Sequence, residues 1–432
     1  MTDLSKKTVC FIDSGGLFVS FARKVAKEFG KAYYYSPWAS SFVRSHTLAP
    51  GVGFPEIERI KYLFDHADDI DLFVFLDIYQ SDTQLFLEKH GARVWGARKG
   101  EEMELHRWEF KQYLKKIGLP VQPCEHIIGF KALREYLKKN SNKFVKTSFV
   151  RGDFETFRHD TYDLSEPRLD DLEHNLGAIK DQYEFIVEDE IKDAVEVGYD
   201  GFTVDGQFPS HAMYGVEVKD AGFLGITLPY AQMPEPVRFV NSKLQNTLKS
   251  YNYRGFLSTE IRYTKKKESY LIDPCCRLGT PSNELLQELF SGWGQTLWDG
   301  AEGKLTSPKV EKPYGCLAII HSDFAAENWQ SVKYPKELDA QVKLRFHTRI
   351  DGKDFVAPQV IGLPDLGAVV GTGNTLLEAI QQCKEYAAQV KGFQLQVSLD
   401  SIDKGLETIK QGEKLGIKFG DKPLPTAEQI RV

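Results

Sequence analysis

The chain has 432 residues, of which 42% are hydrophobic and 27% charged. This composition is typical of a folded protein of roughly two to four domains, and it excludes a peptide hormone, a lone binding module or a wholly disordered chain. Lysine and arginine total 55 against 61 aspartates and glutamates, so the formal net charge is −6. This balance disfavours bulk nucleic-acid binding, which depends on a basic surface.

The six cysteines form no C-x-x-C pair and have no matched histidine spacing. We therefore expect neither a disulfide framework nor a zinc site, and a reducing cytosol fits the chain best. The strongest apolar run, residues 72–76, is far too short to span a bilayer. We expect no membrane anchor and a cytoplasmic location.

The first hundred residues alternate between strand-like and helix-like segments. A buried-strand run at 8–13 leads through the turn Ser14-Gly15-Gly16 into a helical pattern that stops at Gly30. Further strands are predicted at 31–35, 71–77 and 92–96, and helices at 57–64 and 82–90. Such alternation favours an α/β fold with a parallel, Rossmann-like sheet covered by helices.

The pattern changes to mixed α+β after Gly100. Helices are predicted at 102–117, 131–139 and 235–251, and strands at 143–149, 183–191, 255–263 and 269–273. Residues 195–208 predict antiparallel strands with turns at Asp200-Gly201 and Asp205-Gly206. A linker at 307–313 opens a third block, whose clearest helix is 375–390. We therefore expect a first domain at 1–100, a central domain at 101–306 with a lid subdomain at about 120–195, and a C-terminal α/β domain at 307–432.

The glycine-rich stretches match no standard nucleotide motif. No Walker A sequence and no true G-x-G-x-x-G occurs. The turn Ser14-Gly15-Gly16 has the composition to bind a phosphate through backbone amides at a helix N-terminus. A plain connecting turn explains it equally well.

The most informative segment is 253–286. If its two strands form a hairpin, Glu260 and Asp273 present carboxylates from neighbouring strands to one divalent cation. Arg277 follows four residues later, where its planar fork suits an anionic substrate or a transferring phosphoryl group. The competing interpretation is a solvated charged hairpin.

These residues resemble a signature of the ATP-grasp superfamily, and within it the chain is most similar to phosphoribosylamine-glycine ligases, which act in purine biosynthesis. The superfamily's acidic residue followed by Glu-x-Asn-x-Arg is matched by Glu260 and then by Asp273, Cys275 and Arg277. Cysteine stands where the family has a metal-binding asparagine, although magnesium prefers oxygen. The resemblance extends to both ends of the chain, at residues 11–16 and 367–379.

The same resemblance implies a set of nucleotide-binding residues. A lysine on a small-domain strand is matched by Lys146, and a phosphate-binding cation in the preceding helix by Arg107. The hinge strand that holds adenine is matched at 187–191, and a ribose-contacting position by Glu196. The implied hinge residues are Glu188, Asp189, Glu190 and Ile191.

The implied function is an ATP-dependent carboxylate–amine ligase that works through an acyl phosphate, with ATP and Mg²⁺ as cofactors. Glu260, Asp273 and Cys275 would face the metal, and Lys146 and Arg107 the phosphates. Arg277, with Ser14, Gly15 and Gly16, would bind the substrate. The expected partners are a small carboxylate such as an amino acid and an amine, and a homodimer is compatible with the sequence.

Two alternatives remain open at the level of the sequence. Residues 17–19 and 278–284 depart from the purine ligase, which leaves open an amino-acid ligase that acts on another amine, such as one on a modified nucleotide. The cysteine at 275 also fits a nucleotide-binding regulatory protein with weakened catalysis.

Overall fold

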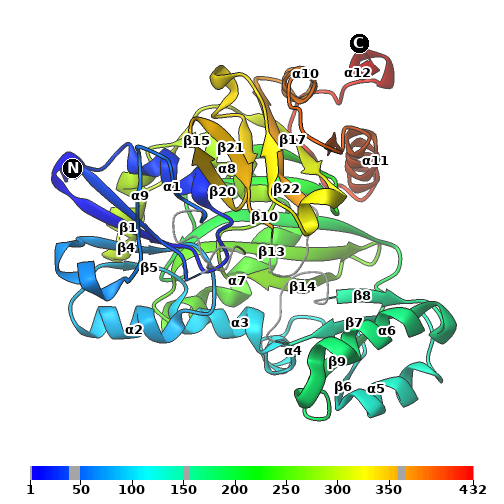
Figure 1. Cartoon of the computed structure of the whole chain (residues 1–432). Coiled ribbons are helices and arrows are strands. Elements are labelled where there is room, and N and C mark those ends of the chain that lie inside the picture. The colour runs from blue at the N-terminus through cyan, green and yellow to red at the C-terminus, as the bar shows by residue number, and fades with distance from the viewer. Residues whose placement is uncertain (1, 38–48, 149–155, 359–364, 432) are drawn as a thin grey trace. The chain divides into compact units, whose positions relative to one another are not determined.

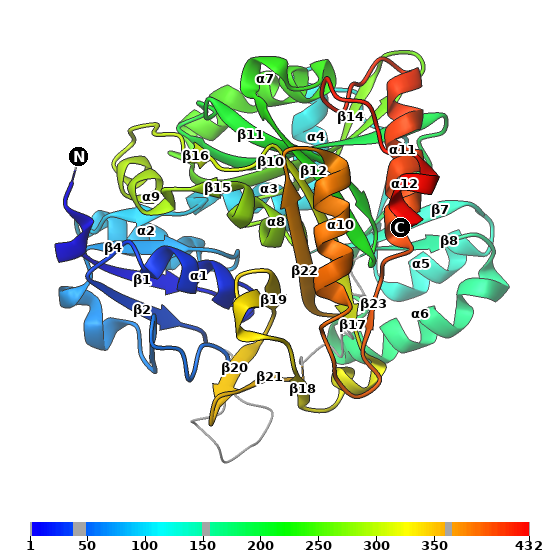
Figure 2. The ribbon, with the colours of Figure 1, turned by 90° about the horizontal axis from the view of Figure 1, so that it is seen from above.

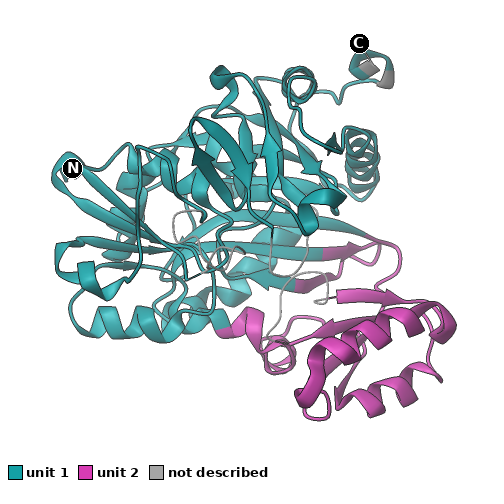
Figure 3. Ribbon diagram, viewed as in Figure 1, with its two compact units in different colours: residues 1–101, 195–261, 273–432 teal, residues 102–194, 262–272 magenta. Residues whose placement is uncertain are grey.

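The computed structural model describes residues 2–37, 49–148, 156–358 and 365–431. It contains two compact units (Figure 3). Unit 1 spans residues 1–101, 195–261 and 273–432, and unit 2 spans residues 102–194 and 262–272. The predicted lid segment at 120–195 falls almost entirely within unit 2. The division of the chain into three domains stays a prediction, because the two units group the N-terminal and C-terminal blocks together.

A five-stranded sheet with the order β3-β2-β1-β4-β5 opens unit 1 (Figure 1). Every pairing in it is parallel, which confirms the expected Rossmann-like start. The prediction of a helix at 57–64 is wrong. A short strand, β3, forms there instead and extends the sheet edge, with Ile60 buried. The elements are β1 (Thr8–Ile12), α1 (Val19–Ala26), β2 (Lys31–Tyr35), β3 (Glu58–Ile60), β4 (Leu72–Phe75), α2 (Ser81–Lys89) and β5 (Val94–Trp95).

A nine-stranded sheet follows, with the order β14-β13-β10-β11-β12-β17-β22-β19 and β23 paired to β17. Its strands are β10 (Ala194–Val204), β11 (His211–Val218), β12 (Gly222–Pro229), β13 (Arg254–Thr264), β14 (Ser269–Cys275), β17 (Tyr314–His321), β19 (Val342–Leu344), β22 (Asp365–Gly373) and β23 (Gln396–Val397).

One of the two turns predicted in this region is wrong. Strand β10 runs straight through Asp200 and Gly201, because the buried Asp200 carboxylate accepts hydrogen bonds from Ser258 and Ser282 and stays in the sheet. The second turn is confirmed at Asp205 and Gly206, both with positive φ.

Helices and small sheets complete unit 1. Figure 2 shows α10 lying along β22. The helices are α7 (Glu235–Ser250), α8 (Ser282–Leu289), α9 (Trp293–Ala301), α10 (Leu376–Ala387), α11 (Ser401–Lys414) and α12 (Ala427–Arg431). The small sheets are β15 (Phe290–Ser291) with β16 (Lys309–Val310), and β18 (Gln330–Val332), β21 (Lys353–Val356) and β20 (His347–Ile350).

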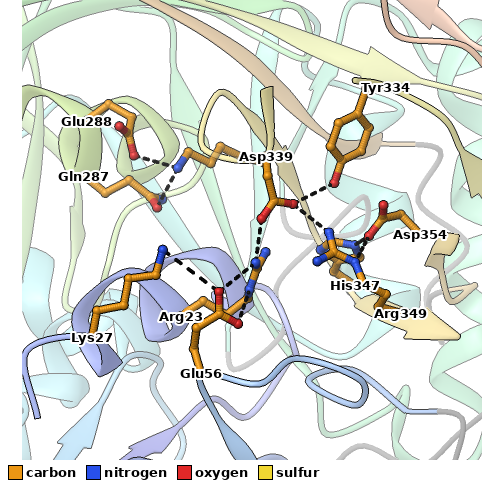
Figure 4. Close-up of polar contacts among 11 residues, drawn as sticks. Arg23, Lys27, Glu56, Gln287, Glu288, Tyr334, Asp339, His347, Arg349 and Asp354 are labelled. Carbon is orange, nitrogen blue, oxygen red and sulfur yellow. Dashed lines mark hydrogen bonds and ion pairs between the residues drawn. The ribbon is translucent and has the colours of Figure 1, made fainter. Parts of the chain in front are cut away.

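A network of charged side chains connects α1 with this C-terminal block (Figure 4). Asp339 contacts Arg23 of α1 at 2.6 Å and Arg349 of β20 at 2.6 Å. Glu56 pairs with Arg23 at 3.1 Å, and Asp354 pairs with Arg349 at 2.8 Å. The network lies wholly within unit 1.

Unit 2 is a four-stranded sheet, ordered β6-β9-β7-β8, with helices around a small core of its own. The single helix expected at 102–117 is two helices that meet at His106. Within the predicted lid subdomain, the sequence of residues 150–160 is polar and contains a glycine; this segment lies partly outside the described residues, and its last part forms β8. The elements are α3 (Glu102–Leu105), α4 (Arg107–Lys116), β6 (Cys124–Ile128), α5 (Phe130–Leu137), β7 (Lys143–Thr147), β8 (Thr156–His159), α6 (Tyr162–Leu176) and β9 (Glu184–Asp189).

No helix in the described part of the chain combines the length and apolar character needed to cross a membrane.

Candidate functional site

A buried glutamate in unit 2 lies between two buried lysines. Glu188 of β9 is 2% exposed, and Lys111 and Lys146 are each 3% exposed. The Lys111 Nζ lies 2.6 Å from Oε1 of Glu188, and the Lys146 Nζ lies 3.6 Å from Oε2. Gln122 donates its amide N–H to Oε2 at 2.7 Å. Two ammonium groups thus surround one carboxylate.

The sequence places these groups through strand register and helix periodicity. In the antiparallel pair β7–β9, Phe144 is opposite Glu188 and Lys146 is opposite Ile186. Residues two apart share a face of a strand, so Lys146 and Glu188 are diagonal neighbours. Lys111 comes from α4, one turn after Arg107 and on the same buried face.

Lys111 is the group here that most clearly calls for a ligand. Its Nζ is close to Glu188, yet the two are not aligned as a hydrogen bond, and the Nζ has no hydrogen-bond partner among the described residues. One carboxylate between two ammonium groups leaves an excess positive charge in a buried place, which is costly. The arrangement therefore suits an added anion such as a nucleotide phosphate, for which Lys111 and Lys146 would supply the positive charge.

The predicted adenine hinge lies at the end of β9. Asp189 forms an ion pair with Lys143, and Glu190 lies 3.5 Å from Arg158. Glu188 faces the two buried lysines. The assignments of Glu188, Asp189, Glu190, Ile191 and Glu196 to adenine and ribose stay predictions, as does that of the buried Arg107.

The predicted metal ligands lie on neighbouring strands. Glu260 is on β13 and Asp273 on β14, both half-buried, and a turn at 265–268 joins the strands. The Cys275 thiol contacts the backbone carbonyl of Arg277 at 3.8 Å. Nowhere in the described ranges do three or more His, Cys, Asp or Glu side chains gather closely enough to hold a metal.

The two carboxylates nevertheless suit the oxygen preference of magnesium, which is commonly held by one or two carboxylates plus substrate phosphates. Glu260 and Asp273 would hold the ion, and the thiol of Cys275 does not suit it. When bound, the ion would neutralise charge on the phosphates. The metal assignment stays a prediction.

The glycine turn after β1 is closed by an internal carboxylate. Asp13 accepts the backbone N–H groups of Gly16, Leu17 and Phe18 at 2.8, 3.1 and 2.7 Å, and the hydroxyl of Tyr34 at 2.6 Å. Burial, reinforced by the nearby negative charge of Asp77, raises the pKa of Asp13 to about 6 despite these donors. These three amides are therefore engaged, and phosphate binding by the turn stays a prediction that would need other donors.

The structure brings Arg277 to this same turn. Its Nε lies 3.8 Å from Oδ1 of Asp77, which follows β4, and the Leu278 N–H donates to the carbonyl of Leu76 at 3.1 Å. Ser14 donates its hydroxyl to the carbonyl of Ile78 at 3.3 Å. The predicted substrate residues Ser14 and Arg277 thus meet at the carboxyl edge of the parallel sheet, where ligands bind in open α/β sheets.

Sequence reasoning missed three of these residues. Lys111 was detectable as the lysine one helical turn after Arg107 on a buried face. Asp13 and Asp77 come one and two residues after buried parallel strands, which places both at the same sheet edge. Their contacts with amides and with Arg277 depend on three-dimensional packing.

Solved structures with the same arrangement of elements are enzymes. The phosphoribosylamine-glycine ligase of Thermotoga maritima matches 91% of this chain and 99% of its own at a TM-score of 0.67 and 16% identity. The biotin carboxylase domain of the Hydrogenobacter thermophilus 2-oxoglutarate carboxylase was solved with MgADP. It matches 96% of this chain and 99% of its own at a TM-score of 0.66 and 11% identity. The chain has the fold of these enzymes.

A third match is the N5-carboxyaminoimidazole ribonucleotide synthetase of Thermotoga maritima, which covers 89% of this chain and 99% of its own at a TM-score of 0.58 and 15% identity. No protein-family model matches the sequence, and no curated protein does. At these identities the likeness establishes the fold, and it confirms the ATP-grasp architecture expected from the sequence.

Proposed function

We propose that the chain is an ADP-forming ligase that uses magnesium-ATP to join a carboxylate to an amine through an acyl phosphate. The observation that carries the proposal is the buried Lys111, which stands with Lys146 around Glu188 and lacks a hydrogen-bond acceptor among the described residues. The fold shared with a structure solved with MgADP supports it. A homodimer acting on small molecules is part of the proposal.

The chemistry proceeds in two displacements. A carboxylate oxygen of the substrate attacks the γ-phosphorus, the bond to the ADP oxygen breaks, and an acyl phosphate forms. The amine nitrogen then attacks the acyl carbon, the carbon–oxygen bond to phosphate breaks, and the amine gives up a proton as inorganic phosphate leaves. Because the reactants are anions that repel each other, each needs a cation to hold it. Lys111 and Lys146 of unit 2 serve the phosphates, and Arg277 of unit 1 serves the substrate.

The first test is ADP release from magnesium-ATP by the purified chain, with pooled amino acids and with and without phosphoribosylamine generated in place. Release that requires both supports a purine-type ligase. Release with amino acids alone, trapped by hydroxylamine as a hydroxamate, supports acyl-phosphate formation with a different amine. ATP binding without any release would favour a non-purine substrate or a regulatory role.

Variants of the lysines test the site itself. Lys111→Met should weaken ATP binding and lower ADP release about 100-fold, because a buried cation on the phosphates is lost. Lys115→Met is the matched control, since Lys115 is exposed on the same helix. Equal activity of the two variants would contradict the phosphate site.

The metal ligands are tested separately. Glu260→Gln and Asp273→Asn should abolish turnover with the fold intact, as circular dichroism would show. If Cys275 faces the metal, Cys275→Asn should lower the magnesium concentration needed for half-maximal rate. Full turnover in both carboxylate variants would remove the metal site from the proposal.

A further inference from the structure

Helix α2, at the lower left of Figure 1, exposes apolar side chains and buries a polar one. A surface helix ordinarily packs its apolar residues on the core and turns its polar residues to water. In α2 the buried Gln84 donates its side-chain amide to Glu101 and accepts the N–H of Arg98. Leu85 and Phe86, which follow it, are 42% and 51% exposed. The outer face of α2 therefore has the character of a covered surface.

The exposed ring of Phe86 is held in place by two other rings. Phe64, which begins the 3-10 helix Phe64–Asp69, packs edge to face against it with ring centroids 5.9 Å apart. The ring of His90 lies 4.3 Å from it on the next turn, and Nδ1 of His90 is 2.8 Å from the carbonyl oxygen of Phe86. Phe64 is itself 58% exposed. These contacts order an apolar patch at the surface of unit 1.

Opposite charges stand at the two ends of this patch. Residues 82, 85, 86 and 89 are all exposed, and their spacing places them along one side of the helix. Asp82 lies in the first turn of α2 and Lys89 in the last, about 10 Å apart along the helix axis. Neither side chain forms an ion pair within the described ranges. We use the name α2 face for Phe64, Asp82, Leu85, Phe86, Lys89 and His90.

The α2 face is complementary to itself. A twofold axis that passes beside Leu85 and Phe86, perpendicular to the helix, places a second α2 antiparallel to the first. Asp82 and Lys89 are equally far from that centre along the sequence. The rotation therefore brings Asp82 of each copy opposite Lys89 of the other, and the two apolar centres meet. A partner of this chemistry is available in every solution of the chain.

The apolar area is that of a small specific interface. With roughly 200 Å² for a fully exposed large side chain, Phe64, Leu85 and Phe86 leave about 300 Å² open on each copy. Interfaces are about 60% apolar, so two such patches correspond to roughly 1,000 Å² in total, the lower limit for a specific interface. We therefore expect a dimer with a dissociation constant in the micromolar range.

We infer that the α2 face binds a second copy of this chain, with the two α2 helices antiparallel across a twofold axis. Leu85 and Phe86 form the centre, and an ion pair between Asp82 and Lys89 of the second copy closes each end. The inference rests on the proposed function only for its homodimer, to which it assigns an interface. The α2 face contains none of the residues proposed to bind ATP, metal or substrate.

Sedimentation equilibrium of the full chain and its variants tests the apolar centre. Phe86→Glu should weaken dimerisation at least about 100-fold, because the symmetry brings two new charges into the apolar centre. Phe393→Glu is the matched control, since Phe393 is another exposed aromatic residue of unit 1 and packs edge to face on Phe324. This control should leave the affinity of the dimer unchanged. Circular dichroism verifies that both variants fold.

Charge reversal tests the antiparallel arrangement. Asp82→Lys and Lys89→Glu should each weaken the homodimer about tenfold, because like charges then face each other at both ends. An equimolar mixture of the two variants should dimerise about as tightly as the wild type, since every end of the mixed dimer joins opposite charges. Mixing would not repair a loss that came from damage to the helix.

The outcomes separate this interface from the rest of the proposed function. A wild-type chain that stays monomeric up to about 100 μM would overturn the inference together with the proposed homodimer. A dimer that Phe86→Glu leaves intact, or a mixture that dimerises no better than the separate variants, would overturn the inference alone. Dimerisation through the α2 face without ADP release in the ATP assay would instead contradict the ligase reaction alone.

Discussion

At the residue scale, the single carboxylate of Glu188 forms ion pairs with two buried lysines. Glu188→Gln should lower the free energy of unfolding of unit 2 by about 3 kcal/mol, because removal of one member of a buried ion pair leaves the other charge uncompensated. Hydrogen exchange of the β7 and β9 amides measures this locally. Glu184→Gln is the matched control on the same strand, since Glu184 pairs with His126 at a more exposed position.

Added anions should distinguish this effect from simple loss of packing. If Lys111 and Lys146 form a phosphate site, millimolar ADP should restore part of the protection lost in Glu188→Gln, because a ligand that binds only the folded state stabilises it. Protection that falls equally in Glu184→Gln, or that ADP leaves unchanged, would contradict the site.

At the element scale, the contact between α10 and β22 depends on a strand glycine. A methyl group at Gly371 would lie 2.2 Å from the carbonyl oxygen of Ala379 and 2.4 Å from the backbone nitrogen of Cys383. Because backbone atoms cannot move aside as a side chain does, Gly371→Ala should push the helix off the sheet. The expected loss is about 3 kcal/mol in the free energy of unfolding.

The control for this substitution is another strand glycine. At Gly198 of β10 the nearest atoms to an added methyl group lie 3.8 Å away, so Gly198→Ala should change stability by less than about 0.5 kcal/mol. Urea unfolding of both variants measures the difference. A similar loss in both would show that the close helix–sheet contact does not determine the effect.

Helices and strands with a clear apolar periodicity were predictable from the sequence. Elements whose conformation depends on tertiary contacts were not. The parallel strands β1, β2 and β4 and the hairpin β13–β14 appear where their apolar patterns indicate. The Asp200-Gly201 pair reads as a turn by local preference, but bonds to Ser258 and Ser282 keep it within β10. Tertiary contacts overrode the local signal there.

The residues of the candidate site also fall into a predictable group and an unpredictable group. Glu260, Asp273 and Arg277 follow from spacing along two strands, and the structure places them on those strands and at the sheet edge. The amides of the glycine turn look free in the sequence, and only the structure shows that Asp13 engages three of them. Hydrogen bonds between a side chain and nearby backbone leave no periodic signal.

At the scale of the whole molecule, the N-terminal layer and the C-terminal block of unit 1 meet through partly buried charges. Arg23 belongs to the first and Arg349 to the second, and the ring of Phe54 lies 4.4 and 5.2 Å from their guanidinium carbons. Asp339 accepts hydrogen bonds from both arginines and from Tyr334 (Figure 4). The N-terminal layer and the C-terminal block of unit 1 should therefore unfold together.

This network predicts how stability depends on pH. Burial alone would raise the pKa of Asp339, but the hydrogen bonds and charges of Arg23 and Arg349 outweigh burial and hold that pKa well below its ordinary value. The folded state thus prefers the ionised form. The stabilisation is complete above the ordinary carboxyl pKa near 3.8 and is lost as the pH falls through the lower folded value.

Asp339→Asn should accordingly cost about 2 kcal/mol at pH 7, because an uncharged amide cannot replace two charge-assisted hydrogen bonds. Urea unfolding of the wild type and the variant at a series of pH values measures the difference in the free energy of unfolding. That difference should stay constant between pH 7 and 5 and shrink below about pH 4, as the wild-type carboxylate becomes protonated. A difference that persists unchanged to the lowest pH at which both proteins fold would show that Asp339 acts through shape rather than charge.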